Sequence, residues 1–372
     1  ITQQSVNYTN HTIMREALEQ WNQNRMRHLL PRQYDVIDKL NMEFCRSIRK
    51  KFPDEEDRVR RMSIIEDGQV RMAHLAIYGS TKVNGVARLH SDIIKKSIFK
   101  DFLDMWPEKF TNVTNGVTQR RWLLHCNPSL ANFISERIGK EWITDFSQIS
   151  KLAAFAQDKQ SQQEFSKIKE ENKQRLIDHL KTTGKIRDYH GKPIEDGPVL
   201  SLDALFDVQV KRIHEYKRQL LNVLHAIMIY QELLDDPESR KIKRTIFIGG
   251  KAAAGYEIAK KIIRLIHCMA RRINNDKRIK DKLKIVFLEN YNVSSAEVII
   301  PAAELSQQIS MAGMEASGTG NMKLSINGAL TIGTEDGANI EMREGTTDKW
   351  WPFSFGSLAE EIEEKQRTQS YD

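Results

Sequence analysis

Cysteine is scarce in this chain. Its 372 residues include three cysteines, Cys45, Cys126 and Cys268, which lie far apart and fit no paired or metal-binding spacing. This pattern favours a reducing compartment without a disulfide framework, and we expect a cytoplasmic location. Long hydrophobic runs are also lacking. The longest, VLHAIMIY at residues 223–230, is too short to cross a bilayer, so we expect no membrane partner.

Several catalytic and binding signatures are missing as well. The ten histidines show no H-E-x-x-H or clustered spacing, so no metal is expected. No G-x-S-x-G elbow appears. The sequence also lacks a pair of carboxylates of the kind that ordinary glycosidases use, although two carboxylates could still be brought together by the fold. The 57 basic and 50 acidic residues give a mild net charge of +7 that is spread along the chain. Without a nucleic-acid motif we expect no nucleic acid, whereas phosphate-bearing ligands suit this charge.

The order of predicted elements indicates an α/β protein. The first part is helical in character, with helices expected over residues 12–30 and 34–52, and a loop at about 110–122 is the candidate domain crossover. A polar helix over 159–181 and a loop over 182–200 follow. From residue 203, predicted strands at 205–210, 244–250, 284–290 and 328–342 alternate with helices at 218–234 and 254–273. This alternation predicts a doubly wound parallel sheet, in which ligands bind beyond the carboxyl ends of the strands. We expect Leu220, Leu221, Leu224, Ile227 and Leu233 to share one side of their helix.

The segment MEASGTGNMKLS, residues 314–325, carries the first candidate chemistry. If a helix begins near Gly320, its free N–H groups favour an anion, and Thr319 adds a donor. Lys323 lies one turn beyond Thr319 on the same face. This geometry suits a cofactor aldehyde that is held by its phosphate while the lysine forms a Schiff base. A glycine-serine turn with a solvated lysine explains the spacing equally well.

A second candidate is the basic segment VQVKRIHEYKRQLL, residues 208–221. Lys211, Arg212, Lys217 and Arg218 lie between a predicted strand and a predicted helix. Cations at a helix N-terminus oppose the helix dipole, so their clustering there is costly unless an anion is present. Two neighbouring phosphates would account for four cations, and a solvated basic helix start is the alternative. The glycine-rich turn at 247–260 is a weaker phosphate-loop signal, more simply a strand-to-helix turn.

Together these motifs resemble the α-glucan (glycogen or starch) phosphorylases. The segments that carry the resemblance, in the family's order, are YTNHT, NGVARLHS, TNGVTQRRWL, DVQVKRIHEYKRQLLN, GGKAAAGY, EASGTGNMK and NGALTIGTEDGANIEM. The resemblance implies a two-domain glycosyltransferase architecture of the GT-B type. Residues 1–112 would form the end of the N-terminal domain, and 113–372 a Rossmann-like domain. Family chains are about twice this length, so we expect a partial chain that lacks most of the N-terminal domain and the end of the C-terminal one.

The resemblance also implies a cofactor and a set of site residues. Pyridoxal 5′-phosphate would be bound covalently, as an aldimine, to Lys323. The residues implied to contact it further are Gly318, Thr319, Lys211, Trp122, Tyr291 and Gln308. Arg212 and Lys217 would hold the substrate phosphate. The residues implied around the glucosyl group are Glu315, Ala316, Ser317, Gly318, Asn115, His11 and Tyr216.

The implied reaction is phosphorolysis of α-1,4-glucan by inorganic phosphate, with retention, to give α-D-glucose 1-phosphate (EC 2.4.1.1). The 5′-phosphate of the cofactor would exchange a proton with the substrate phosphate, so no protein carboxylate pair is required. A homodimer is expected for the full-length form. Departures from the family pattern are Thr81, Gln119, Ala254 and Asn292. Two alternatives are a truncated chain that binds cofactor or glucan without turnover, and a nucleotide-sugar glycosyltransferase, which leaves the Schiff-base lysine unexplained.

Overall fold

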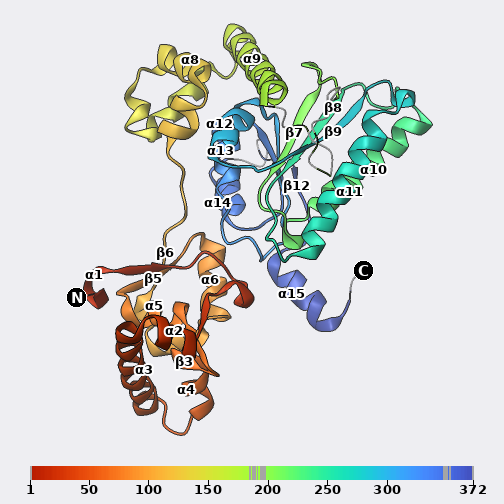
Figure 1. Cartoon of the computed structure of the whole chain (residues 1–372). Helices are drawn as coiled ribbons and strands as arrows, with labels where there is room; N and C mark the ends of the chain where they lie inside the picture. Colours follow the sequence, from red (N-terminus) through yellow and green to blue (C-terminus); the bar gives the residue numbers. More distant parts are fainter. Residues whose placement is uncertain are drawn as a thin grey trace.

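The computed structural model describes residues 2–183, 186, 190, 192, 198–346, 351 and 353–370. Most of the loop predicted over 182–200 lies outside these residues. Figure 1 shows two bodies of structure, joined by the extended segment 113–118 that follows strand β6 (Phe110–Asn112). The two bodies touch where the Arg88 backbone N–H and the Thr114 hydroxyl both donate to the Glu341 carboxylate, over 3.0 and 2.7 Å.

The N-terminal body packs helices around two small sheets. Its helices are α1 (Thr2–Ser5), α2 (Gln23–Leu29), α3 (Pro31–Lys51), α4 (Glu56–Met62), α5 (Met72–Gly79), α6 (Arg88–Lys96) and α7 (Lys100–Met105). Strands β1 (Asn7–Thr9), β5 (Lys82–Gly85) and β6 pair in parallel, and β2 (Gln20–Asn22), β4 (Gln69–Arg71) and β3 (Ile65–Glu66) pair antiparallel. The core of this body gathers around the fully buried Phe44, whose ring stacks on Trp106 with centroids 5.3 Å apart.

The helix predicted over 12–30 is wrong in its first half. A 3₁₀ turn (Arg15–Ala17) and strand β2 precede α2, and Trp21 is 41% exposed in β2. Pairing of β2 with β4 overrides the helical spacing, and the Asn22 side chain caps α2 by accepting from the Arg25 N–H. The helix predicted over 34–52 is confirmed as α3, which begins at Pro31, a residue suited to the first helical position.

The larger body is built on a six-stranded parallel sheet. Its spatial order is β12 (Phe353–Ser354), β11 (Leu330–Gly333), β10 (Leu305–Gln308), β7 (Leu205–Val210), β8 (Arg244–Gly249) and β9 (Leu283–Leu288). The chain runs from β7 outward to β9 and then crosses to β10 on the other side, so the strand order reverses between β7 and β10. The predicted doubly wound sheet is therefore confirmed, and its switch point lies at β7 and β10.

Helices cover both faces of this sheet (Figure 1). On one face, α10 (Gln219–Asp235) and α11 (Glu257–Asn274) pack on alternate residues of the central strands such as Ile246 and Ile285. On the other face, α9 (Lys159–Thr183), α12 (Val293–Ala302) and α13 (Gly320–Ile326) pack on residues such as Phe206 and Val208. Among the described residues, this body also contains the α-helices α8 (Pro128–Ile138), α14 (Ala338–Glu344) and α15 (Ala359–Thr368), a π-helical turn at Arg120–His125 and several 3₁₀ segments, the longest at Phe146–Phe155.

The predicted apolar side of α10 is only partly right, because Leu233 is fully buried and Ile227 packs against the core. Leu220 and Leu224 are 42% and 50% exposed, while Val223, Ala226 and Ile229 face the core. This helix is apolar around most of its circumference, so the leucine spacing alone does not identify the buried face. The helix predicted over 159–181 is confirmed as α9.

Candidate active site

Two residues that are 97 positions apart in the sequence meet at the switch point of the sheet. Lys211 directly follows β7, and Gln308 is the last residue of β10. The Lys211 ammonium donates to the Gln308 side-chain oxygen over 2.9 Å. Gly250 makes room for this turn, because a Cβ there would lie 2.0 Å from the Lys211 carbonyl oxygen. Both predicted cofactor-binding residues therefore lie where ligands bind in open α/β sheets.

Lys211 and Gln308 line a small polar pocket. The other residues that line it are Ser310, Glu315, Ser317, Asn321, Thr334, Asp336 and Asn339. Burial lowers the pKa of Lys211 to about 8, against the attraction of the Glu315 carboxylate. Within the described part of the chain, Lys211 forms no ion pair. The pocket thus contains a cation that no carboxylate contacts directly, which is an arrangement suited to an anion.

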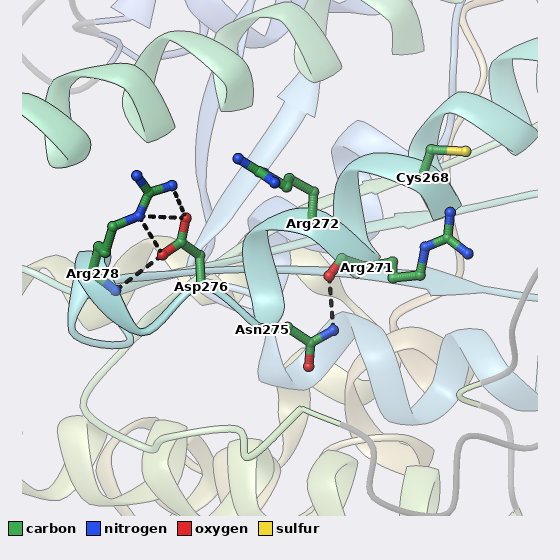
Figure 2. Close-up of a pocket in the computed structure, with 6 residues that line it drawn as sticks. All are labelled: Cys268, Arg271, Arg272, Asn275, Asp276 and Arg278. Carbon is green, nitrogen blue, oxygen red and sulfur yellow. Dashed lines mark hydrogen bonds and ion pairs between the residues drawn. The ribbon is translucent and has the colours of Figure 1, made fainter.

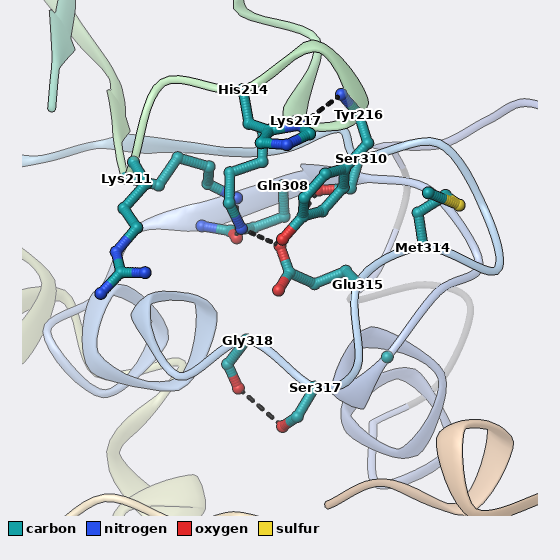
Figure 3. Close-up of polar contacts among 12 residues, drawn as sticks. Lys211, His214, Tyr216, Lys217, Gln308, Ser310, Met314, Glu315, Ser317 and Gly318 are labelled. Atoms are coloured by element: carbon teal, nitrogen blue, oxygen red, sulfur yellow. Dashed lines mark hydrogen bonds and ion pairs between the residues drawn. The ribbon is translucent and has the colours of Figure 1, made fainter. Parts of the chain in front are cut away.

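Lys217 and Glu315 form an ion pair at the edge of this pocket (Figure 3). The Lys217 Nζ lies 2.5 Å from Glu315 Oε2, and it also lies 4.5 Å from the centre of the Tyr216 ring. Burial is the largest single effect and opposes both charges. Glu315 and Tyr216 together nevertheless raise the pKa of Lys217, and the two lysines Lys217 and Lys211 with their hydrogen-bonding neighbours lower the pKa of Glu315. The structure therefore brings together Lys217, Tyr216 and Glu315, three predicted site residues from two distant segments.

Asp336 shapes the loop that carries Glu315. Its carboxylate accepts from the backbone N–H groups of Gly313, Met314, Glu315 and Gly337, over 2.8 to 3.3 Å. Burial raises the pKa of Asp336 to about 7, helped by the charge of Glu315 and opposed by these N–H groups. With both oxygens engaged by donors, this one side chain fixes the backbone of the loop on either side of the pocket.

Lys323 lies on α13, which begins at Gly320 as the sequence predicted. The Lys323 amine lies 4.0 Å from the centre of the Trp122 ring, and burial lowers its pKa. Gly318 and Thr319 lead into the helix, and Gly318 has a φ of +73°, a conformation that favours glycine. Tyr291 packs against the same hydrophobic core as Trp122, and burial raises its pKa to about 12. The predicted cofactor lysine and its predicted aromatic neighbour are thus in contact.

Two of the four predicted basic residues do not join the pocket in the expected way. The Arg218 guanidinium donates to the carbonyl oxygens of Ile309 and Ser310, over 2.6 and 3.2 Å, so its charge stabilises the backbone after β10. Arg212 is exposed. Four cations were predicted to crowd one strand end, whereas Arg218, in a left-handed conformation at φ 57°, turns toward the chain instead.

His11 and Asn115 lie at the other body and in the linking segment. His11 is exposed, and the Asn115 N–H donates to the Val86 carbonyl over 2.9 Å. Among the contacts of the described residues, none joins their side chains to the pocket. Ala316 is buried beside Ser317, whose hydroxyl donates to the Gly318 carbonyl over 2.8 Å.

Three of the four residues that depart from the family pattern form hydrogen bonds in the structure, and the fourth is exposed. Asn292 caps α12, since its side chain accepts from the Ser295 N–H and its own N–H donates to the Ser295 hydroxyl. The buried Gln119 side chain donates to the Ile143 carbonyl over 2.8 Å. The Thr81 N–H donates to the Val6 carbonyl, and Ala254 is exposed. These substitutions leave the pocket residues unchanged.

A wider pocket lies at the C-terminal end of α11 (Figure 2). It is lined by Cys268, Arg271, Arg272, Asn275, Asp276 and Arg278. Arginines are favoured at a helix C-terminus by the helix dipole. Arg278 pairs with Asp276 over 2.6 Å, and the Arg272 guanidinium donates to the Tyr230 hydroxyl over 3.2 Å. Of these arginines, Arg278 is therefore paired with a carboxylate, and Arg272 bonds to a neutral hydroxyl.

Sequence reasoning missed several polar residues of the pocket. Asp336, Thr334 and Asn339 were included in a strand predicted over 328–342, whereas β11 ends at Gly333 and α14 begins at Ala338. An Asp-Gly pair after an apolar strand is a turn signal that could have located Asp336. In the part of the chain that the structure describes, no group of histidine, cysteine or carboxylate side chains could hold a metal ion, and no helix is long and apolar enough to cross a membrane.

Comparisons with known proteins show what this chain is similar to. Residues 1–372 match the family described as carbohydrate phosphorylase. The muscle form of glycogen phosphorylase from Rattus norvegicus is 50% identical over 366 residues, which are 98% of this chain and 42% of the relative. The liver form from Homo sapiens is 51% identical over 365 residues, 97% of this chain and 42% of the relative. The chain thus spans well under half the length of these curated relatives.

Proposed function

The chain belongs to the carbohydrate phosphorylase family, and on this premise we propose that the protein phosphorolyses an α-1,4-glucan. Inorganic phosphate would accept the terminal glucosyl unit, and α-D-glucose 1-phosphate would be released with retention of configuration. The observation that carries the proposal is the position of Lys211, whose ammonium enters a polar pocket at the switch point without an ion-pair partner among the described residues. A phosphate group supplies the missing negative charge.

The residues present fit pyridoxal 5′-phosphate as the cofactor. Lys323 would hold it covalently, because a half-buried amine with a lowered pKa is more often neutral and can attack an aldehyde. Gly318, Thr319 and Lys211 would hold its phosphate, and the Lys211–Gln308 contact would orient the ammonium toward it. Trp122 and Tyr291 would line the ring site. When bound, the group supplies proton exchange with the substrate phosphate through its own phosphate.

The remaining residues would bind substrate. Lys217 and Arg212 are the proposed cations for the substrate phosphate, and an exposed Arg212 is free to turn toward an incoming ligand. Glu315 would accept hydrogen bonds from sugar hydroxyls through the oxygen that Lys217 leaves free, with Ala316, Ser317 and Gly318 beside it. Tyr216, Asn115 and His11 are proposed around the glucosyl group. The cation at Lys217 also keeps Glu315 ionised, and therefore an acceptor, at neutral pH.

We also propose that the substrates are an α-1,4-glucan and inorganic phosphate, that the full-length form is a homodimer, and that the protein is located in the cytoplasm. The alternative is a chain that binds cofactor or glucan without turnover. Phosphate-dependent release of glucose 1-phosphate from maltodextrin, by purified 372-residue protein incubated with pyridoxal phosphate, separates the two. We expect release that disappears in Lys323→Ala. Cofactor binding without release would favour the alternative, and release that persists in Lys323→Ala would overturn the role of this lysine.

A further inference from the structure

Asn327 connects the backbones of Lys323 and Trp122. It follows α13 directly and is fully buried. Its side-chain nitrogen donates to the Lys323 carbonyl over 2.9 Å and to the Trp122 carbonyl over 2.6 Å. The side chains of the same two residues meet with the Lys323 amine 4.0 Å from the Trp122 ring centre. One amide therefore holds both sides of this contact.

The orientation of the Asn327 amide is determined by its surroundings. A nitrogen must face the two carbonyl oxygens, so the side-chain oxygen faces Asn127, whose nitrogen donates to it over 3.0 Å. The Asn127 oxygen then accepts from the Asn172 side chain, also over 3.0 Å. All three residues are buried, so this chain of amides joins the end of α13 to the start of α8 and to α9.

A buried cation supports the same residue from its backbone. The Lys169 ammonium, on α9, donates to the Asn327 carbonyl over 3.2 Å and to the Pro301 carbonyl over 2.8 Å. Asn327 thus has partners for its side-chain nitrogen, its side-chain oxygen and its carbonyl oxygen. A buried network that is fully bonded has one arrangement, since any rotation of the amide would leave buried polar atoms unpaired.

Capping of α13 alone would need only the bond from Asn327 to Lys323. The bond from Asn327 to Lys323 lies within one turn, as at many helix ends. The bond to Trp122 spans 205 positions of the sequence, and the bond to Asn127 spans 200. These long-range bonds locate α13 against the π-helical turn that carries Trp122.

We propose that Asn327 is a positioning residue that holds the Lys323 amine against the Trp122 ring. Asn127 and Asn172 keep its amide in the required orientation. The role of Lys323 as the cofactor lysine rests on the proposed function, whereas the position of its amine against the Trp122 ring does not. The two ideas can therefore fail separately.

The first experiment measures Lys323 in the full chain without cofactor. Reductive methylation with formaldehyde and cyanoborohydride over a range of pH, followed by peptide mass spectrometry, gives the pH midpoint at which the Lys323 amine becomes reactive. Exposed Lys167 in the same digests is the reference. Asn327→Asp places a carboxylate oxygen against two carbonyl oxygens, so we expect the amine to leave the ring and the midpoint to shift upward, toward the ordinary lysine pKa of about 10.4.

Asn274→Asp is the matched control. The Asn274 side chain also donates to a backbone carbonyl, that of Ile285, over 2.8 Å, but it lies on α11 across the sheet. We expect its Lys323 midpoint to equal that of the wild type. Asn127→Ala is the second variant, since it removes the donor to Asn327 and leaves the donors of Asn327 in place. An unchanged midpoint in folded Asn327→Asp or Asn127→Ala would overturn the proposal, as would failure of both to fold while Asn274→Asp folds.

The second experiment adds pyridoxal phosphate and measures its apparent affinity by absorbance and borohydride trapping. We expect Asn327→Asp to weaken binding about tenfold, in the range seen when residues that orient a ligand-holding side chain are changed. Wild-type affinity in a folded Asn327→Asp would contradict the positioning role. If the wild-type chain forms no adduct at Lys323, the proposed function fails, and the methylation midpoints alone decide the role of Asn327.

Discussion

The Lys217 ammonium lies 2.5 Å from the Glu315 carboxylate, although the two residues are 98 positions apart in the sequence. Their side chains are 12% and 19% exposed. The Ser310 hydroxyl, 3.3 Å away, is a further donor to the same carboxylate oxygen. The pair therefore joins the turn after β7 to the loop after β10 at the switch point of the sheet.

Removal of one partner should destabilise the protein more than removal of both. Lys217→Met leaves a mostly buried carboxylate unpaired, and we expect the free energy of unfolding to fall by about 2 kcal/mol. The double variant Lys217→Met/Glu315→Gln should recover part of this loss. Urea unfolding measures both effects. Lys100→Met, which removes the exposed pair between Lys100 and Asp104, is the control and should cost less than about 0.5 kcal/mol. Additive losses in the double variant would show that the two side chains act independently.

Phosphate binding should depend on the protonation of Lys211. Because burial lowers the pKa of this lysine to about 8, the free protein loses the positive charge there as pH rises through that value. We expect the affinity for inorganic phosphate, measured by calorimetry, to fall between pH 7.5 and pH 9. Above the pKa of Lys211 the fall should be about tenfold for each pH unit. Lys211→Arg keeps its charge in this range, so its affinity should vary little. The same fall in both proteins would assign the titration to another group.

Gly337 should tolerate no side chain. It has a φ of +52°, and a Cβ there would lie 2.6 Å from the Ser317 carbonyl oxygen and 2.9 Å from that of Glu315. Gly337→Ala would push the loop away from Asp336, and we expect a loss of about 2 kcal/mol or more in thermal or urea unfolding. Gly79→Ala, at a site with open space around the added carbon, should change stability little or increase it. Equal effects in the two variants would contradict the close approach at Gly337.

The buried Lys169 should contribute to stability in a pH-dependent way. Lys169→Met leaves the carbonyls of Pro301, Ala303 and Asn327 without this donor, so we expect a loss of about 2–4 kcal/mol. Burial lowers the pKa of Lys169 to about 8, and the unfolded value is about 10.4. Between these values the unfolded chain binds more protons, so the free energy of unfolding of the wild type rises with pH.

The difference between wild type and Lys169→Met should therefore be larger near pH 9.5 than near pH 7, about 10-fold or more in the unfolding equilibrium constant. Urea unfolding at the two pH values measures it. Lys167→Met, on the exposed side of the same helix, is the matched control and should show neither effect. A pH-independent difference would mean that Lys169 keeps its ordinary pKa in the fold.

Sequence patterns predicted the parallel sheet because each central strand is a short apolar run that ends at a glycine or a polar turn, as at Gly249. They did not predict β2, because pairing with β4 is a long-range contact that outweighs the local helical spacing around Trp21. They identified Lys211, Lys217 and Lys323 from charge and spacing. They did not reveal that Arg218 bonds to backbone carbonyls or that Asp336 organises the loop, because such bonds form only between segments that the fold brings together.

The most direct test of the central proposal is to locate the pyridoxal phosphate on the chain. The protein is incubated with the cofactor, reduced with borohydride and digested, and the modified peptides are identified by mass spectrometry. We predict one stoichiometric adduct on Lys323 that is lost in Lys323→Ala and retained in Lys167→Ala. Substoichiometric labelling scattered over exposed lysines, or a full adduct on another residue, would contradict the proposed role of this site.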